Sequence, residues 1–139
     1  MWRLVSTNTI ELDPVAMGRP RYYNGRVLTP KSSARYMKAV VPMLQYQLVK
    51  QIYDTAIKIE VIYFFRRPAR LKKKSLEQIK VLKTTKPDLD NLNKMLLDCM
   101  QKAELFPDDK QVTILHSEKY YCGEHDTPKT IYKIYEYYK

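Results

Sequence analysis

Residues 86–112 have the sequence KPDLDNLNKMLLDCMQKAELFPDDKQV, which predicts a helix from about Leu89 to Ala103. The apolar positions of this helix fall within one sector of the helical wheel and comprise Leu89, Leu92, Leu96, Cys99, Met100 and Ala103. The opposite sector is polar and comprises Asp90, Asn91, Lys94 and Asp98. We therefore expect a helix that buries its apolar side in a core and leaves its acidic side for solvent or for a ligand.

The segments on either side of this helix show strand and helix patterns. β-branched and aromatic residues predict strands at residues 2–12, 55–65, 112–121 and 130–138. A second helix is expected at 33–50, with Ser32 or Ser33 as its cap and with Pro42 as a kink or a new first turn. This order of elements predicts an α+β fold, a small single domain over residues 1–139 with a mixed β-sheet packed against helices.

Two long connections carry much of the positive charge. Residues 13–33 contain prolines and glycines that predict an irregular segment, and residues 66–86 form a basic connection in which 75–78, SLEQ, could begin a short helix. Residues 17–38 hold six basic residues and no acidic residue, and residues 66–86 hold nine basic residues and one glutamate. Long connections in a small chain are usually functional or disordered, and this composition favours function.

The charge pattern favours nucleic acid as the partner. The net charge is +10, and residues 1–87 hold 18 Lys and Arg against 5 Asp and Glu. Basic residues at this density suit a phosphate backbone, whose neutralisation releases counterions. The candidate DNA contacts are Arg19, Arg21, Arg26, Lys31, Arg66, Arg67, Lys72, Lys73, Lys74 and Lys86. Tyr22 and Tyr23 lie among them and could stack on bases. A solubility surface and an acidic membrane are the alternatives, but neither explains the acids that follow the basic run.

Other features indicate a cytoplasmic protein that does not span a membrane. No stretch approaches the roughly 18 apolar residues of a membrane span. The first residues lack the long apolar core of a signal peptide. Cys99 and Cys122 form neither a disulfide framework nor a metal-knuckle spacing, so we expect both to be reduced and structural.

The acidic residues of 86–112 could form a metal site. Asp88 would lie at the start of the helix, where the helix dipole favours a carboxylate, and Asp90 would lie two residues further on. Asp108 and Asp109 follow the helix, and a chain reversal could return them to its start. Carboxylate oxygens suit Mg²⁺ or Mn²⁺, and such a metal polarises a phosphodiester and lowers the pKa of an attacking water. Lys94 could stabilise the charge that develops in the transition state.

Each acidic residue also has an ordinary structural interpretation. Asp88 could simply cap the helix, and residues 90–98 could form a solvated ladder of charges at i,i+4 spacing. Residues 108–109 could be turn residues after Pro107. Taken one at a time, these interpretations are at least as good as a metal site. The acids gain a functional meaning only as a group, together with the basic segments upstream.

The whole segment 86–112 resembles the signature of the RusA family of Holliday junction resolvases. That family carries an Asp-x-Asp-Asn-Leu-x-Lys helix, a further aspartate on this helix and an Asp-Asp pair before Gln-Val, and all of these are present at matching spacing. The GRPR segment, which follows the first predicted strand, is also similar to family members. The family often has glycine near position 104, where this chain has Glu104, and glycine eases a left-handed helix ending.

The resemblance implies a homodimeric, Mg²⁺-dependent endonuclease that acts on four-way DNA junctions in recombination and repair. The family's metal-binding catalytic aspartates are matched by Asp88, Asp90 and Asp109, and its important lysine by Lys94. Supporting positions are matched by Asn91, Asp98 and Asp108. Because the family is common on phages and prophages, such an origin is expected here as well.

The sequence therefore leads to one hypothesis and three alternatives. The hypothesis is a structure-specific endodeoxyribonuclease that resolves junctions by paired nicks in opposed strands. The first alternative is a non-catalytic module that binds branched DNA, and the second is a nuclease for flaps, forks or RNA. The third is a protein whose basic face binds an acidic protein. Incubation of labelled four-way DNA with and without Mg²⁺ separates the hypothesis from a binding module.

Overall fold

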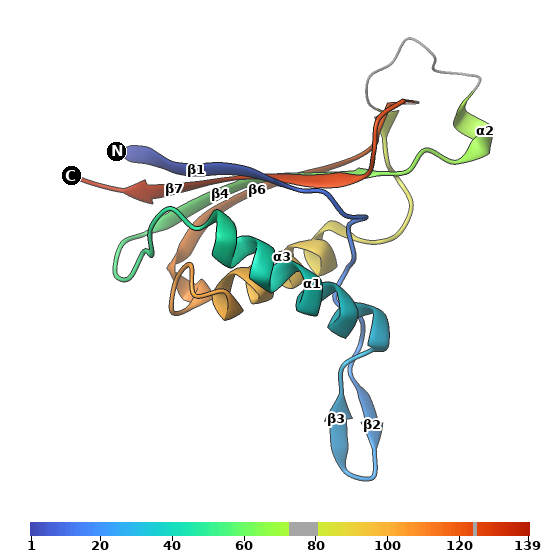
Figure 1. The fold of residues 1–139 in the computed structure, drawn as a ribbon, viewed down its shortest axis with the longest axis horizontal. Coiled ribbons are helices and arrows are strands. Elements are labelled where there is room, and N and C mark those ends of the chain that lie inside the picture. The colour runs from blue at the N-terminus through green and yellow to red at the C-terminus, as the bar shows by residue number, and fades with distance from the viewer. Residues whose placement is uncertain (73–80, 124) are drawn as a thin grey trace.

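The computed structural model describes residues 1–72, 81–123 and 125–139, and Figure 1 shows helices lying along one face of a twisted sheet. The described strands are β1 Trp2–Ile10, β2 Arg21–Tyr23, β3 Arg26–Leu28, β4 Ile57–Phe65, β5 Val81–Leu82, β6 Val112–Tyr121 and β7 Lys129–Tyr137. The described helices are α1 Lys31–Gln47, α2 Ala69–Lys72 and α3 Leu89–Lys102, and a short 3-10 turn, η1, covers Asp109–Gln111. This architecture confirms the predicted α+β class.

The main sheet is mixed, as the sequence predicted. Its strand order in the described residues is β1-β7-β4-β6-β5. β4 pairs antiparallel with β7 and parallel with β6. Since parallel neighbours need a crossover connection, the chain between β4 and β6 must return across the sheet, and α3 forms most of that return. β5 pairs only with the last two residues of β6, through Val81–Tyr121 and Leu82–Tyr120.

The core lies between this sheet and the pair of helices α1 and α3. Every second residue of β4 faces the helices, and Ile57, Ile59, Val61 and Tyr63 are at most 2% exposed. The apolar side of α3 meets them with Leu92, Met95, Leu96, Cys99 and Met100. Each such aliphatic side chain contributes about 1.5–3 kcal/mol by its burial, which fixes the rotation of α3 about its axis. The polar side of α3 must then face outward.

The predictions for the N-terminal cap of α1 and for the effect of Pro42 were partly wrong. The helix starts after Pro30, without a side-chain cap, and Ser33 lies inside the helix with no exposed surface. Ser33 binds the loop before the helix instead: its hydroxyl donates to Ala16 O and accepts from Gly18 N. Pro42 lies within a helix that continues to Gln47, so it does not mark a new first turn. Pro42 is exposed, so water can replace the hydrogen bond that it removes.

The segment 13–33, predicted to be irregular, contains a β-hairpin. β2 and β3 pair through Arg21–Leu28, Tyr22–Val27 and Tyr23–Arg26. Asn24 and Gly25 form the connection with positive φ angles of 49° and 75°. An Asn-Gly dipeptide between two strands favours this two-residue turn, so the signal for the hairpin was present in the sequence. Figure 1 shows the hairpin projecting away from the sheet and helices.

Several smaller expectations can also be compared with the structure. The short helix expected at 75–78 lies outside the described residues, whereas α2 was not predicted. Cys99 and Cys122 are free and buried, and burial raises the pKa of Cys99 to about 12, so its thiol stays protonated at neutral pH. Within the described ranges, no helix combines the length and the apolar character that a membrane crossing requires.

Candidate active site

The start of α3 is held against the sheet by a lysine of β6. Lys119 Nζ donates to the carbonyl oxygens of Thr85 and Pro87, at 2.8 Å in both cases. The Lys86–Pro87 peptide bond is cis, and Asp88 follows as the N-terminal cap position of α3. The Asp88 carbonyl accepts the first helical bond, from Leu92 N at 3.1 Å, but its carboxylate makes no cap hydrogen bond. The simple capping interpretation of the Asp88 side chain was therefore wrong.

The middle of α3 is fixed by a polar side chain at the border of its apolar side. Asn93 Oδ1 accepts from the Tyr63 hydroxyl and Asn93 Nδ2 donates to Ser117 Oγ, both at 2.9 Å. Burial raises the pKa of Tyr63, so this hydroxyl remains a donor at neutral pH. These bonds join α3 to β4 and β6, and they set the direction in which the neighbouring residues Asp90 and Lys94 point.

The contacts of α3 with β6 show how the two elements are aligned. Ser117 meets Asn93, and Lys119, two residues later in β6, meets Pro87 at the helix start. β6 therefore runs opposite to α3, and the first residues of β6 lie beside the later turns of the helix. η1 directly precedes β6, so Asp109 arrives at the middle of α3. The expected chain reversal occurs, and it brings Asp109 into a hollow shared with Asp90 of the first helical turn and with Asp98 further along α3, but not with Asp88.

An open hollow of about 360 Å³ gathers most of the acidic residues predicted for the site. It is lined by Asp90, Asn93, Lys94, Leu97, Asp98, Asp109 and Leu115, and it is called the acidic hollow below. Asp88 lies outside it, in a neighbouring hollow lined by Arg19, Lys86, Pro87, Asp88 and Asn91. The structure thus places Asp90, Asp98 and Asp109 together with Lys94, and it places Asp88 with two cationic residues.

Negative charge is concentrated where η1 meets α3. The pKa of the Asp109 carboxyl is raised, first by a hydrogen bond with the Asp108 carboxyl and then by slight desolvation and by the charges of Asp108 and Asp98. The pKa of Asp108 is lowered instead, mainly because its Oδ1 accepts from Lys110 N at 2.9 Å. Asp90 Oδ1 accepts from Asn91 N at 2.9 Å. A cation placed in this hollow would relieve the repulsion between Asp98 and Asp109.

A divalent metal site requires donor atoms of the right chemistry at the right spacing. The chemistry of the donor atoms is suitable, because Mg²⁺ and Mn²⁺ prefer carboxylate oxygens and water. The spacing of the donors does not fit: among the residues that the structure describes, no three His, Cys, Asp or Glu side chains lie close enough together to hold a metal ion. Asp90 and Asp109 face the same hollow, and the third carboxylate of the expected set, Asp88, lies around the helix axis from them.

Most of the predicted DNA contacts are exposed to solvent. The exposed ones are Arg19, Arg21, Arg26, Lys31, Arg66 and Lys86. Arg67 corrects the prediction, because it is only 3% exposed and its Nε donates to Cys122 O at 3.1 Å, so it stabilises the end of β4. Lys73 and Lys74 lie outside the described residues, and the side chain of Lys72 is not described.

Sequence reasoning missed the residues that position the site. Asn93, Ser117 and Lys119 each join α3 or its preceding segment to β6. Only Asn93 gave a local signal, as a polar residue bordering the apolar sector of the helix. Ser117 and Lys119 lie in β6, and the residues of this strand do not indicate that it packs beside α3. Their roles therefore depend on a pairing that the tertiary structure alone defines.

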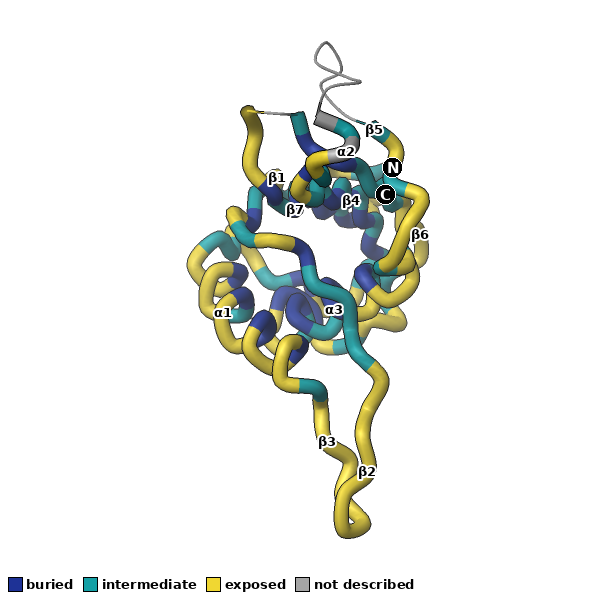
Figure 2. Tube along the Cα trace, turned by 90° about the vertical axis from the view of Figure 1, so that its right-hand side faces the viewer, coloured by how far each residue is buried: buried dark blue, intermediate teal, exposed yellow. Residues whose placement is uncertain are grey.

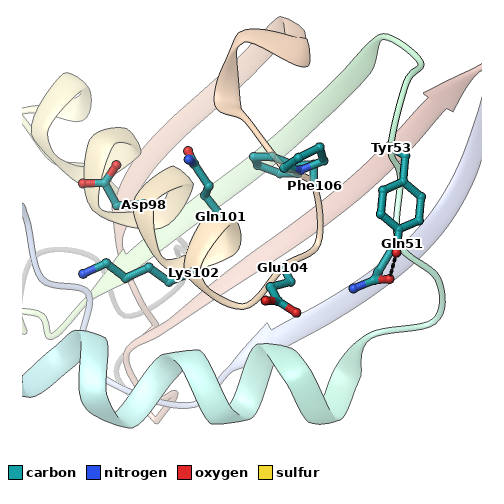
Figure 3. Close-up of a pocket in the computed structure, with 8 residues that line it drawn as sticks. Gln51, Tyr53, Asp98, Gln101, Lys102, Glu104 and Phe106 are labelled. Carbon is teal, nitrogen blue, oxygen red and sulfur yellow. Dashed lines mark hydrogen bonds between the residues drawn. The ribbon is translucent and has the colours of Figure 1, made fainter.

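A wider hollow, of about 680 Å³, lies at the other end of α3, and Figure 3 shows its walls. It is lined by Gln51, Tyr53, Asp98, Gln101, Lys102, Glu104, Phe106 and Pro107. The side chains of Gln51 and Tyr53 hydrogen-bond to each other on its far side (Figure 3). This hollow holds fewer carboxylates than the smaller acidic hollow, so we assign the chemistry to the smaller one.

An acidic hollow beside exposed cationic side chains, on a small α+β fold, is suited to a protein that acts on phosphodiester backbones. A family model described as endodeoxyribonuclease RusA matches residues 11–134. The chain therefore belongs to the endodeoxyribonuclease RusA family, which is a family of nucleases, and the resemblance seen in the sequence is confirmed. A Bacillus subtilis (strain 168) protein described as uncharacterized protein YqaN is 30% identical over 125 residues, which cover 84% of this chain and 87% of that protein.

Proposed function

We propose that this protein is a metal-dependent endodeoxyribonuclease that resolves four-way DNA junctions by paired nicks, in recombination and repair. The observation that carries the proposal is the acidic hollow, in which Asp90, Asp109 and Lys94 come together in a chain of the endodeoxyribonuclease RusA family. Carboxylates repel the phosphates of DNA unless a cation screens them. A bound metal would therefore allow the acidic hollow and the basic surface around it to contact the same DNA.

Asp88, Asp90 and Asp109 are the residues proposed to hold Mg²⁺, or Mn²⁺ in its place. Their side chains would have to draw together around the ion, because no three His, Cys, Asp or Glu side chains of the described residues stand at metal-binding spacing. Asp90 and Asp109 face the same hollow, and the Asp88 carboxylate, two residues away, is not used as a helix cap. A metal held by these carboxylates would polarise the phosphodiester and lower the pKa of the attacking water. Asp98 and Asp108 add negative charge next to Asp109. Asn91, which follows Asp90, is tied to the loop before the hairpin, because its backbone oxygen accepts a hydrogen bond from Met17 N at 3.0 Å.

The remaining residues of the site bind and orient the DNA strand. Lys94 shares the acidic hollow, so its ammonium can stabilise the negative charge that grows on the phosphate oxygens during cleavage. Arg19 and Lys86 line the hollow next to Asp88 and can hold the neighbouring phosphates of the same strand. In this arrangement the cationic groups would place a phosphate over the carboxylates, which would hold the metal that activates the water.

A homodimer is the proposed working form, because two opposed strands must be cut. The described part of β6 from Val112 to Glu118 is an edge of the sheet, since β5 covers only its last two residues. Ile114 and Leu115 are 44% and 38% exposed on this edge. An open strand edge with apolar side chains is suited to pairing with a second copy. Such pairing would bring two acidic hollows near each other, since Asp109 directly precedes β6.

The test is cleavage of labelled DNA. The wild-type protein should nick four-way junctions in symmetric pairs when Mg²⁺ is added, and chelation should stop cleavage while leaving the junction bound. Linear duplexes, flaps, forks and RNA of matched length serve as controls. Binding without nicks at any metal concentration would show a binding module instead, and preferred cutting of flaps or forks would change the substrate. Ile114→Lys should shift the protein to a monomer in analytical ultracentrifugation.

A further inference from the structure

The β2–β3 hairpin has an unusual surface for so small an element. All residues from Arg21 to Leu28 are exposed, and Figure 2 shows this exposure along the whole projection. Tyr22 is 80% exposed, Tyr23 67% and Val27 60%. A two-stranded hairpin that packs on nothing gains little stability from these side chains, and large exposed apolar groups on a projection usually mark a contact surface.

The base of the hairpin is anchored firmly at the rim of the acidic hollow. Gly18 N donates to the buried Ser33 hydroxyl at 2.9 Å, and that hydroxyl donates to Ala16 O at 3.3 Å. A Cβ at Gly18 would lie 2.7 Å from Pro30 Cγ, so only glycine allows the two ends of the hairpin to approach this closely. Residues at the base, including Pro20 and Thr29, line a hollow of about 190 Å³ together with Lys94 and Asp98.

The two faces of the hairpin differ in chemistry. Residues paired directly across the hairpin share a face, and successive pairs alternate. One face therefore carries the pair Tyr22–Val27, which is apolar. The other face carries Arg21–Leu28 and Tyr23–Arg26, which add two positive charges. The partner must accordingly offer both negative charge and flat apolar surface, and the absence of acidic residues from 17 to 38 favours a polyanion.

Branched DNA offers both features at one place. In a linear duplex the base faces are covered by stacking, whereas at a branch point the end pairs of the arms can expose a face beside closely spaced phosphates. Tyrosine stacks on such faces without regard to base identity, and arginine binds the phosphates. We propose that the hairpin is a finger that enters the branch point, where Tyr22 stacks on an exposed base and Arg21 and Arg26 hold the flanking phosphates. This inference rests on the proposed function and names what selects the branched substrate.

The finger can be tested by binding alone, without divalent metal, so that no DNA is cut. Tyr22→Ala should weaken binding to a four-way junction about five- to one-hundred-fold, the range expected for loss of one base–aromatic stack, and should leave duplex binding unchanged. Tyr22→Phe keeps the ring and should retain junction affinity. Tyr46→Ala is the matched control, because Tyr46 is 93% exposed on α1 and should affect neither substrate.

A fluorescent base locates the contact. 2-Aminopurine at the branch point should change its emission when the wild-type protein binds, and the change should be lost with Tyr22→Ala and kept with Tyr22→Phe. The same base placed ten pairs away should not respond. Melting temperatures should agree among these variants, because Tyr22 makes no contact with the core, and this agreement separates a binding effect from misfolding.

The results distinguish this inference from the proposed function. The finger would be overturned if the wild-type protein preferred the junction over duplex DNA and Tyr22→Ala bound the junction as tightly as the wild type. The nuclease proposal would be unaffected by that result. A change of oligomeric state in Tyr22→Ala, measured by ultracentrifugation, would assign the hairpin to contacts with a second copy and also overturn the finger. If the wild-type protein bound duplex and junction equally and cut neither, the proposed function would fail first.

Discussion

The acidic hollow and the finger, both predicted to meet the same DNA, are built in opposite ways. The hollow lies on α3, whose apolar side is buried and whose polar side is fixed by Asn93 bonding to Tyr63 and Ser117. The finger projects from the rest of the described chain, and residues 21–29 are all exposed. The hollow is acidic in a cationic chain, and the finger is cationic and aromatic.

This difference reflects the separate requirements of chemistry and of substrate choice. Catalytic groups must be held in place by their supports, since a small displacement of a reacting group costs a large factor in rate. A contact that selects a branched shape must instead reach away from the protein and accept a substrate that is itself flexible. Variants of the hollow should therefore change cleavage more than binding, and variants of the finger should change binding more than cleavage of bound DNA.

The largest effect is expected at the carboxylates that are proposed to bind the metal. Asp90→Asn should reduce junction cleavage about 10³-fold, because a neutral amide replaces a ligand charge, and should leave binding within a factor of two or so. Asp88→Asn should do the same, although Asp88 lines a different hollow from Asp109. Single-turnover cleavage and gel-shift titrations measure the two properties.

Asp98→Asn is the comparison that decides which carboxylates form the metal set. Asp98 shares the acidic hollow with Asp90 and Asp109, but its assigned role is only to add charge. Cleavage should then fall by about ten-fold, at the lower end of the ten- to hundred-fold range for an outer-shell group. If Asp98→Asn removed cleavage and Asp88→Asn did not, Asp98 would replace Asp88 as the third ligand.

The next largest effect is expected at Lys94. Lys94→Ala should slow cleavage about 100-fold with little change in junction affinity, since its ammonium is assigned to charge that appears only in the transition state. Lys94→Arg keeps a positive charge and should recover part of the rate. Equal losses of cleavage and binding in Lys94→Ala would show that this lysine is an ordinary phosphate contact.

A smaller effect is expected at the arginines of the finger. Arg21→Ala and Arg26→Ala should each reduce the slope of log affinity against log salt concentration by about 1, the value for one lost phosphate contact. Junction binding should weaken more than duplex binding, because the finger is proposed to hold the phosphates that flank the branch point. Salt titrations by fluorescence anisotropy provide the slopes, and an unchanged slope would remove these residues from the DNA-binding surface.

The smallest effect concerns the end of α3, which leads to Asp109. Glu104 adopts a positive φ of 65°, a conformation that glycine adopts without steric cost. Glu104→Gly removes a steric cost of about 1–2 kcal/mol and should raise the melting temperature by a few degrees. Junction cleavage should stay unchanged, because the helix ending is already formed. A lower melting temperature would mean that Glu104 makes compensating contacts.

The sequence predicted elements with local signals well. The helix 89–103 and the strands 55–65 and 112–121 match α3, β4 and β6 closely, because burial on one side imposes a regular period on each. The α1 cap was wrong because Ser33 serves the loop before it, a contact with residues 16–18 that no local pattern reveals. The hairpin was missed because prolines and glycines around it outweighed the Asn-Gly signal.

The sequence by itself predicted which residues form the site and what chemistry they are suited to. The spacing of Asp88, Asp90 and Lys94 follows from helix periodicity, and the basic surroundings follow from composition. Only the tertiary structure decided which acids meet. Because β6 pairs parallel with β4 and runs opposite to α3, Asp109 reaches a hollow that it shares with Asp90 and Asp98, whereas Asp88 lines a different hollow. Such alignment depends on contacts between distant segments, which periodicity along one element cannot specify.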